Sequence, residues 1–338
     1  MTKALILTSD DKPGGIRRAF LENLAVLQDI HGLSATICAP AVLRDLAPDT
    51  HLTRNWHTLS AMGRGLLRHL PFISSAVLPK GMFDVALVHN GFLCKAARRK
   101  ARRIIGICHN DKFHHFSAAD EVICLTPKAI DKAIQAGWPD TKLHLLPHYL
   151  DFTSPEPAPV RPQLRTIAAL GRLVPKKNMG LFIRAAAQVK QMRPDLRFLL
   201  AGDGPEKARL AALNAELGQP VEMQGWVKMH DFAPTVDLAI IPSLDEPFGY
   251  VLPEMVDAGI PVLASTSFGP DLMLNSGARA PLFDPHDPAG LARLIRTYAD
   301  DSPAYQGLHA QCQQLKTDPL FSRSSHLKKW TDMLTSAD

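Results

Sequence analysis

The chain has 338 residues, of which 46% are hydrophobic and 21% charged, and its formal net charge is +5. No apolar run approaches the roughly 18 to 20 residues that cross a bilayer, which excludes an integral membrane protein, and the apolar content excludes a disordered chain. At roughly 100 to 200 residues per domain, this length predicts two globular domains.

Two features of the sequence indicate the compartment. The first residues carry neither a basic leader nor a small-residue cleavage site, so we expect a cytoplasmic protein. The five cysteines are widely spaced without a Cys-x-x-Cys pair, and we expect them to be reduced and buried rather than bound in disulfides or to zinc.

Short apolar runs alternate with amphipathic segments of helix length, a pattern typical of parallel α/β sheets. In the first half, a predicted strand over 4–8 is followed by a turn at Pro13-Gly14-Gly15 and a helix over 16–31. Further strands are predicted at 34–39, 85–89, 104–108, 121–125 and 143–146.

The segment 151–163 contains four prolines, which fit neither a helix interior nor a central strand. We interpret it as a linker between a domain over 1–150 and a second domain over 164–320. The second half repeats the α/β pattern, which predicts two Rossmann-like domains facing a cleft. A helix near the end, within 321–338, is expected to pack back toward the first domain. The elements predicted for the second half are strands at 166–170, 197–201, 221–224, 238–242 and 262–265, with helices over 179–192 and 205–217.

Two glutamates eight residues apart, Glu246 and Glu254, bracket a turn and the start of a predicted helix. Backbone N–H groups at such a helix start favour a phosphate, and the two carboxylates can accept hydrogen bonds from sugar hydroxyls. Alternatively, Glu254 only complements the helix dipole and Glu246 is an ordinary loop residue. The spacing by itself leaves both interpretations open.

Arg172 and Lys177 follow the predicted strand 166–170, at the edge where α/β sheets bind ligands. The guanidinium of Arg172 and the ammonium of Lys177 could neutralise a diphosphate, or both could be solvated cations on a polar loop.

In the first half, Gly15 allows close approach of a ligand to the backbone, although an ordinary tight turn explains the paired glycines equally well. His89 and His109 each end a predicted strand, where a histidine is more often structural than catalytic.

Taken together, these segments resemble the family 4 retaining glycosyltransferases, within the glycosyl transferases group 1. The resemblance covers nearly the whole chain. It includes Pro13-Gly14-Gly15 in the first loop and Phe321-Ser322 at the start of the closing helix. The motifs that carry it are the E-x7-E pattern of Glu246 and Glu254, Gly171-Arg172-x4-Lys177, Gly202-Asp203-Gly204-Pro205, Gly225-Trp226-Val227 and Gly259-Ile260-Pro261.

The resemblance implies a GT-B fold in which the second domain holds most of a nucleotide-sugar donor. It implies that Arg172 and Lys177 bind the diphosphate and stabilise the leaving group, and that Glu254 binds the ribose. The sugar and phosphates are assigned to Glu246, to Gly171 and to the backbone amides of Phe248, Gly249 and Tyr250. The residues assigned to the opposite side of the reaction centre are Gly15 and His109.

The same resemblance implies retention of anomeric configuration by a front-face path, without a carboxylate nucleophile. The sequence contains no Asp-x-Asp motif, so we expect neither a catalytic metal nor another cofactor. Three departures from the family pattern stand out. Asn178 replaces a glycine, His148-Tyr149 replaces an asparagine-glycine pair, and 46–79 matches no segment of known role.

Six basic residues fall within nine positions near residue 100. A predicted helix over 91–103 places Lys95, Arg98, Arg99 and Arg102 on one face without a carboxylate. Such a face favours phosphorylated lipid head groups or a phosphate-bearing acceptor. A solvated helix face is the alternative.

The sequence therefore predicts a hexosyltransferase-type enzyme that transfers sugar from a nucleotide sugar, with UDP favoured, to a cell-surface glycan precursor such as lipopolysaccharide core. Its expected partners are this donor, a glycan or glycolipid acceptor and the anionic inner face of the cytoplasmic membrane, but no nucleic acid. The alternatives are a nucleotide-sugar epimerase of the same fold and a non-catalytic sugar-binding relative.

Overall fold

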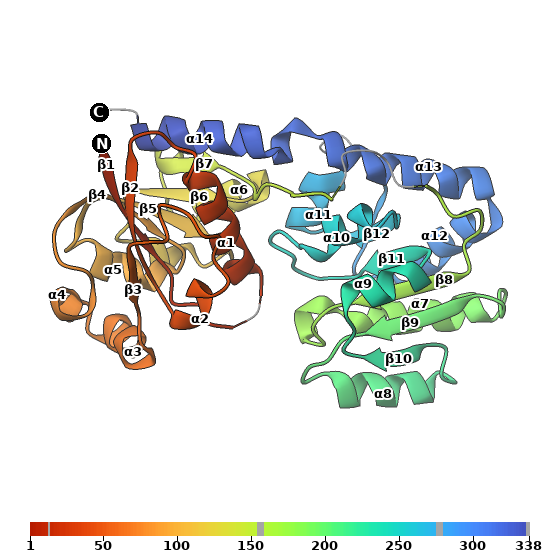
Figure 1. Cartoon of the computed structure of the whole chain (residues 1–338). Coiled ribbons are helices and arrows are strands. Elements are labelled where there is room, and N and C mark those ends of the chain that lie inside the picture. The colour runs from red at the N-terminus through yellow and green to blue at the C-terminus, as the bar shows by residue number, and fades with distance from the viewer. Residues whose placement is uncertain (13, 154–158, 275–279, 336–338) are drawn as a thin grey trace. The chain divides into compact units, whose positions relative to one another are not determined.

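The structure is a computed structural model of the whole chain, and it describes residues 1–12, 14–153, 159–274 and 280–335. Pro13 of the predicted glycine turn and residues 154–158 of the predicted linker lie outside the described residues. The chain divides into two compact units (Figure 1). Unit 1 comprises Met1–Tyr149 together with Pro319–Asp338, and unit 2 comprises Leu150–Asp318.

Within the described part of the chain, the sheet of unit 1 has seven parallel strands in the order β3-β2-β1-β4-β5-β6-β7. In the centre, Leu5 of β1 lies between Thr36 of β2 and Ala86 of β4. The strands are β1 (Thr2–Leu7), β2 (Leu33–Ala39), β3 (Trp56–Thr58), β4 (Phe83–Val88), β5 (Ala101–Cys108), β6 (Glu121–Cys124) and β7 (Leu143–Leu145).

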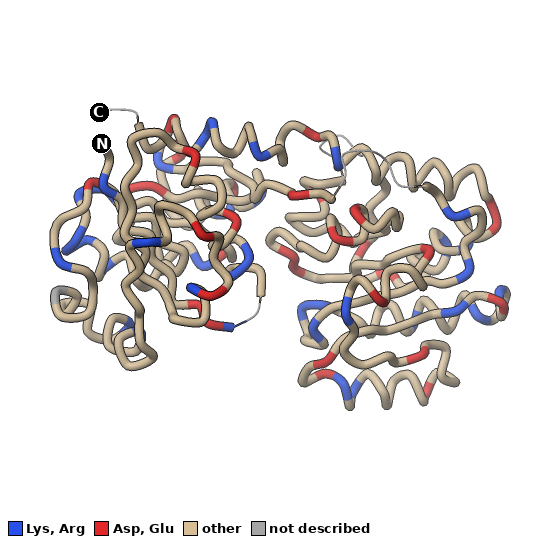
Figure 2. Tube along the Cα trace, in the orientation of Figure 1, with Lys and Arg blue, Asp and Glu red and all other residues tan. Residues whose placement is uncertain are grey.

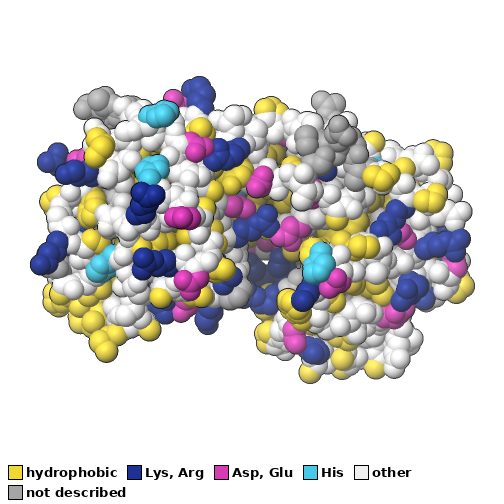
Figure 3. Space-filling view, viewed as in Figure 1, with side chains coloured by type: hydrophobic (Ala, Val, Ile, Leu, Met, Phe, Trp, Pro, Cys, Tyr) yellow, Lys and Arg dark blue, Asp and Glu magenta, His cyan; other side chains and the backbone are white. Residues whose placement is uncertain are grey.

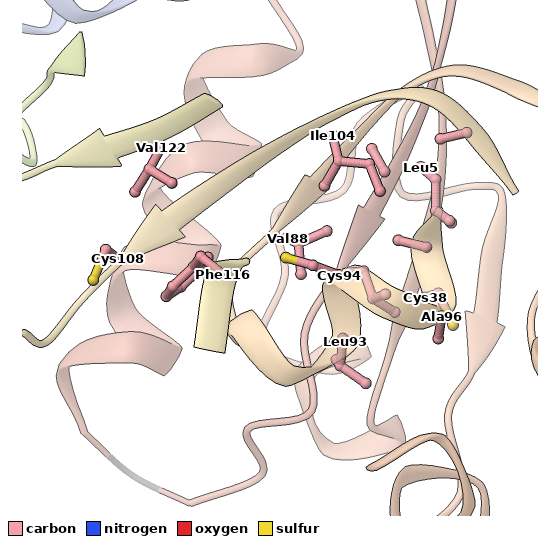
Figure 4. Packing of buried hydrophobic residues seen from close by; sticks show 14 of the residues in the cluster. Leu5, Cys38, Val88, Leu93, Cys94, Ala96, Ile104, Cys108, Phe116 and Val122 are labelled. Carbon is pink, nitrogen blue, oxygen red and sulfur yellow. The ribbon is translucent and has the colours of Figure 1, made fainter. Parts of the chain in front are cut away.

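Apolar side chains are buried on both faces of this sheet, as expected for parallel strands covered by helices. One of the two cores contains four of the five cysteines, and Figure 4 shows Cys38, Cys94 and Cys108 in it. All five cysteines are buried and free, as predicted. The helices and 3₁₀ turns of unit 1 are α1 (Gly15–Leu27), α2 (Ala41–Arg44), α3 (Ala61–His69), η1 (Pro71–Ile73), α4 (Ser74–Val77), η2 (Gly91–Leu93), α5 (Cys94–Ala97), η3 (Phe113–Phe116), α6 (Pro127–Gln135), η4 (Asp140–Lys142) and α14 (Arg323–Thr335), with η9 (Pro319–Phe321) before it.

The predicted helix over 91–103 is wrong. The chain forms the 3₁₀ turn η2 and the four-residue helix α5, and then enters strand β5 at Ala101. The reason is the register with β4, because Phe83 at the start of β4 pairs with Ala101 and extends β5 upstream of the predicted strand. Figure 2 shows the Lys and Arg of this unit spread over several segments, including α14.

The last helix, α14, belongs to unit 1, where it packs against α1. Trp330 is buried, and its indole N–H donates a hydrogen bond to Nε2 of His326 at 3.0 Å. The other ring nitrogen of His326 bonds the Pro147 carbonyl oxygen at 3.1 Å. The end of the chain therefore contributes to the core that α1 covers.

Within the described residues, the sheet of unit 2 has six parallel strands in the order β10-β9-β8-β11-β12-β13. Two parallel sheets flanked by helices confirm the predicted α/β class with two Rossmann-like domains. The elements are β8 (Thr166–Leu170), η5 (Pro175–Lys177), α7 (Met179–Lys190), β9 (Arg197–Ala201), α8 (Lys207–Glu216), β10 (Glu222–Gly225), α9 (Met229–Phe232), η6 (Ala233–Thr235), β11 (Leu238–Ile241), α10 (Val251–Asp257), β12 (Val262–Ser265), α11 (Phe268–Met273), β13 (Leu282–Phe283), α12 (Pro288–Asp300), α13 (Ser302–Gln313) and η8 (Gln314–Thr317).

Candidate functional site

A pocket of about 320 Å³ opens at the carboxyl edge of the unit 2 sheet. The carboxyl ends of neighbouring parallel strands meet at one edge, and the loops that follow β8, β9 and β10 form the pocket together with the start of α10. The residues that line it include Gly171, Arg172, Gly202, Asp203, Trp226, Val227, Met229 and Val251.

Glycines allow these loops to approach one another closely. Gly202 has φ 142°, and a Cβ there would overlap the carbonyl oxygen of Gly171. Backbone hydrogen bonds fasten the loops, with the Leu173 N–H donating to the Asp203 oxygen at 2.8 Å and the Gly202 N–H to the Gly225 oxygen at 2.6 Å. Backbone atoms therefore form much of the pocket, and backbone hydrogen bonds between the loops hold them in place.

Two exposed side chains in the lining of the pocket, Arg172 and Trp226, can interact with a ligand. Arg172 has no ion-pair partner among the described residues, so its guanidinium can bind an anion. Trp226 is 72% exposed although it lines a pocket, and an indole in this position can stack on a planar ring. The sequence showed the Gly225-Trp226-Val227 motif without a role for the indole. A large aromatic residue directly after a strand end is the signal that could have found it.

Lys177 and Glu246, both predicted site residues, form an ion pair. Their side chains are 16% and 9% exposed, and the Ser243 hydroxyl donates to the same Glu246 oxygen at 3.2 Å. A backbone hydrogen bond of 2.8 Å from Leu244 to Lys176 joins the loops that carry them. The structure thus brings together a cation and a carboxylate that lie 69 residues apart in the sequence.

The turn between Glu246 and α10 places the other predicted residues of this segment. Phe248 is buried, and its ring lies 5.1 Å from that of Tyr250, between centroids. Gly249 has φ 88°, a conformation that favours glycine. Glu254 lies in the first turn of α10 and is partly buried. The turn is tied to α11 because Gly269 N–H donates to the Glu246 carbonyl oxygen at 2.8 Å.

In unit 1, the predicted residues lie at the carboxyl ends of its strands. Gly15 begins α1, directly after Gly14 at the N-cap. His89 follows β4 and His109 follows β5, with His89 Nδ1 and His109 Nε2 3.0 Å apart. His148 lies next to His109, with a ring-centroid distance of 5.3 Å. Burial lowers the pKa of all three imidazoles, so they are neutral near pH 7.

The expectation of four cations without carboxylates is wrong for two of them. Arg98 pairs with Asp120 at 2.7 Å, and Arg102 lies 3.9 Å from Asp84. Asp84 lies in β4 and Asp120 directly precedes β6, so neither carboxylate is included when the cations are projected onto the face of a single helix. Lys95 and Arg99 are exposed, and neither forms an ion pair with a described residue.

Metal ligands and membrane spans can be examined in the described ranges only. No three His, Cys, Asp or Glu side chains there are grouped so as to hold a metal ion. No helix there combines the length and apolar character needed to cross a bilayer.

The fold of the chain is that of the GT-B glycosyltransferases. Anabaena Alr3699/HepE, solved in complex with UDP and glucose, has a TM-score of 0.77 at 20% identity, with 100% of both chains covered. The apo form of the lipopolysaccharide outer core galactosyltransferase WaaB has a TM-score of 0.71 at 16% identity, covering 98% of both chains.

Residues 153–314, which make up most of unit 2, match the family described as glycosyl transferases group 1. The lipopolysaccharide core biosynthesis glycosyltransferase LpsD of Rhizobium meliloti (strain 1021) is 31% identical over 207 residues, which are 58% of this chain and 58% of LpsD. LpsE of the same strain, described in the same words, is 26% identical over 56% of this chain and 57% of its own length. The chain thus spans little more than half the length of these curated relatives.

Proposed function

We propose that this protein is a retaining glycosyltransferase that transfers a sugar from a nucleotide sugar, preferably a UDP-sugar, to a cell-surface glycan precursor. The observation that carries the proposal is the unit 2 pocket, in which a guanidinium without an ion-pair partner among the described residues and an exposed indole lie beside close-packed backbone loops. This combination suits a nucleoside diphosphate, since its base is planar and its phosphates are anionic.

The proposed roles follow the chemistry of each group. Trp226 stacks on the nucleobase, and Glu254 accepts hydrogen bonds from the ribose. Arg172 and Lys177 bind the diphosphate, while Glu246, Gly171 and the backbone amides of Phe248, Gly249 and Tyr250 hold the sugar and phosphates. To Gly15 and His109 of unit 1 we assign contact with the reacting sugar, as the resemblance of the sequence implies. These assignments rest on the resemblance of the sequence and, within unit 2, on the positions of the side chains.

In the proposed reaction, the bond between the anomeric carbon and the β-phosphate oxygen breaks. The acceptor hydroxyl oxygen bonds to the same face of that carbon, and its proton passes to the departing phosphate. Charge develops on the diphosphate, where Arg172 and Lys177 stabilise it. Because two cations supply this stabilisation, we propose that turnover requires no metal ion and persists in excess chelator.

The proposal is tested by incubating the full chain with UDP- and GDP-sugars while measuring thermal stability and nucleotide release, with and without a lipopolysaccharide-core acceptor. Arg172→Ala should lower kcat/KM about 100- to 1,000-fold, by analogy with the loss of an oxyanion-hole donor. Arg184→Ala, which removes an exposed arginine of α7, is the matched control. Equal activity of both variants would remove the donor-site assignment. An epimerase would release no glycosylated acceptor, and a sugar-binding relative would bind without turnover.

We also propose that unit 1 contacts the anionic inner face of the cytoplasmic membrane, where a glycolipid acceptor resides. Helix α5, which carries Lys95 and is followed by Arg99, packs against η1, which carries the exposed side chain of Phe72. Helix α3, which carries the exposed Met62, also packs against η1. Basic and apolar side chains reach the same face of this unit (Figure 3). This composition suits the boundary between head groups and acyl chains.

The membrane proposal is tested with vesicles that contain anionic lipid. Lys95→Gln/Arg99→Gln should reduce co-sedimentation of the full chain, and binding should weaken with salt because such attraction is screened. Arg98→Gln/Arg102→Gln removes the same charge from the cations that face carboxylates, and it should have less effect. Equal losses in the two variants would mean that only net charge matters and would contradict the proposed surface.

A further inference from the structure

The imidazole rings of His89 and His109 share a hydrogen bond at the carboxyl edge of the unit 1 sheet. Their nitrogens Nδ1 and Nε2 are 3.0 Å apart, and the ring planes differ by 18°. His89 is 2% exposed and cannot touch a substrate, whereas His109 is partly exposed. The position of the proton on the buried His89 ring therefore determines whether Nε2 of His109 donates or accepts the hydrogen bond between the two rings.

A neutral imidazole has one N–H and one lone pair, so either ring could donate in this hydrogen bond. The second nitrogen of His89, Nε2, is buried and has no hydrogen-bond partner among the described residues. If His109 donated, His89 would carry its own proton on Nε2 as a buried N–H without an acceptor. The ring of His89 lies 5.1 Å from that of Phe20, between centroids, and even an aromatic face is only a weak acceptor.

The other assignment avoids this cost. If His89 donates from Nδ1, its Nε2 carries only a lone pair, and orphaned buried N–H groups are rarer in proteins than acceptors with unused capacity. His109 Nε2 then accepts the hydrogen bond, and the proton of His109 resides on Nδ1. No described residue accepts a hydrogen bond from that Nδ1–H.

We infer that His89 is a positioning residue that holds His109 in the Nδ1–H tautomer, so that His109 offers an N–H donor to an oxygen of the nucleotide sugar. The identity of this ligand rests on the proposed function, whereas the tautomer does not. An N–H stabilises an oxygen on which negative charge develops, whereas a bare lone pair would repel that oxygen. A hydroxyl group could bond to either form of the nitrogen, because it both donates and accepts. Burial lowers the pKa of both rings, so the tautomer, rather than the charge, decides what His109 presents.

The tautomer can be observed directly by long-range ¹H–¹⁵N NMR of the full chain labelled at histidine, because protonated and bare ring nitrogens have different ¹⁵N shifts. The His109→Gln variant identifies the His109 signals by their disappearance. We expect His109 to be protonated at Nδ1 and bare at Nε2 in the free protein. A His109 protonated at Nε2 would overturn the inference.

Two substitutions of His89 separate positioning from packing. His89→Leu fills the site without a donor, and the His109 signals should shift toward a mixture of tautomers. His89→Asn retains an amide N–H near the position of Nδ1 and should preserve the wild-type signals. His31→Leu, at an exposed histidine of the same unit, is the control for substitution as such. Unchanged His109 signals in His89→Leu would contradict the role assigned to His89.

Kinetics provide a second measurement. His89→Leu should lower kcat/KM for sugar transfer about three- to tenfold, as expected for one neutral hydrogen bond, and His89→Asn should recover most of this loss. If His89→Leu does not fold, the wild-type spectrum and His89→Asn decide the question. If the wild-type tautomer is as inferred but no nucleotide sugar binds or turns over, the proposed function fails and the tautomer assignment stands.

Discussion

At the scale of single residues, the ion pair between Lys177 and Glu246 already engages both groups in the free protein. A bound diphosphate would draw Lys177 away from a carboxylate that is itself largely buried. The Ser243 hydroxyl, which also donates to Glu246, would then be one remaining polar partner of that carboxylate. Lys177 therefore has a structural role in addition to the one proposed for it in donor binding.

This dual role leads to a prediction that distinguishes Lys177 from Arg172. Lys177→Ala should lower the free energy of unfolding by about 3 kcal/mol, because it leaves a buried carboxylate without its cation. Arg172→Ala should leave stability within about 0.5 kcal/mol, because Arg172 is exposed. Urea denaturation of both variants measures the difference. The double variant Lys177→Met/Glu246→Leu should recover most of the stability, and equal destabilisation by both single variants would contradict this view.

The sequence brought both residues into the candidate site but did not predict their pairing. Lys177 follows β8 and Glu246 follows β11, and these strands are neighbours only because the sheet order places β8 between β9 and β11. Strand order is a long-range property that local periodicity does not contain. The hydrogen bond between His89 and His109 has the same origin, since β4 and β5 are adjacent in the other sheet.

At the scale of elements, the loops around the unit 2 pocket depend on Gly202. An alanine there would have both a strained φ and a side chain that overlaps the Gly171 carbonyl oxygen. We expect Gly202→Ala to lower the free energy of unfolding by about 1 to 3 kcal/mol and to weaken nucleotide binding, because the loop that carries Arg172 must move. Thermal denaturation and a nucleotide titration measure the two effects.

Gly307 in the middle of α13 is the matched control. It is exposed, and a Cβ there would meet no heavy atom within 4 Å. Gly307→Ala should stabilise the chain by about 0.5 to 1 kcal/mol through helix propensity, without a change in nucleotide affinity. A Gly202→Ala variant that behaves like Gly307→Ala would show that the loops around the pocket tolerate a side chain.

Some elements could be predicted from the sequence to the residue, and others could not. The strands β8, β9 and β12 have the predicted bounds because each is a short apolar run between polar segments. The segment after Gly91 was mistaken for a helix. Strand β5 begins at Ala101, and its next two residues are Arg102 and Arg103, which do not indicate a strand in the sequence. The strand β3 and helix α3 were missed, since 46–79 has no apolar run long enough to identify them.

At the scale of the whole molecule, unit 1 is assembled from both ends of the chain. Helix α14 inserts Trp330 into the core that also contains residues of β1, and Lys329 Nζ donates to the Leu145 carbonyl oxygen at 2.9 Å. This unit also contains four histidines whose pKa is lowered by loss of solvent around the ring, namely the buried His89, His148 and His326 and the partly exposed His109. Its stability must therefore depend on pH.

His326 determines the direction of this dependence and the pH range in which it occurs. Burial lowers its pKa from 6.5 to about 4, and a proton on Nε2 would displace the hydrogen bond that Trp330 donates there. The unfolded chain consequently binds more protons than the native one between these two values. The stabilisation is complete above pH 6.5 and is lost as the pH falls toward 4, with a slope of up to about 1.4 kcal/mol per pH unit for each such histidine.

We therefore predict that acid destabilises unit 1 well before its carboxylates are protonated. Three of the four tryptophans, Trp56, Trp138 and Trp330, belong to unit 1, so tryptophan fluorescence during urea denaturation reports mainly on that unit. The urea concentration at the midpoint of unfolding should fall continuously as the pH is lowered from 7.5 to 4.5. His326→Gln should be less stable than the wild type at pH 7.5, because it loses the hydrogen bonds of the imidazole. Its midpoint should nevertheless depend less steeply on pH, because one titrating group is gone. A wild-type midpoint that is constant over this range, or a variant with an unchanged slope, would mean that these buried imidazoles do not control the acid response.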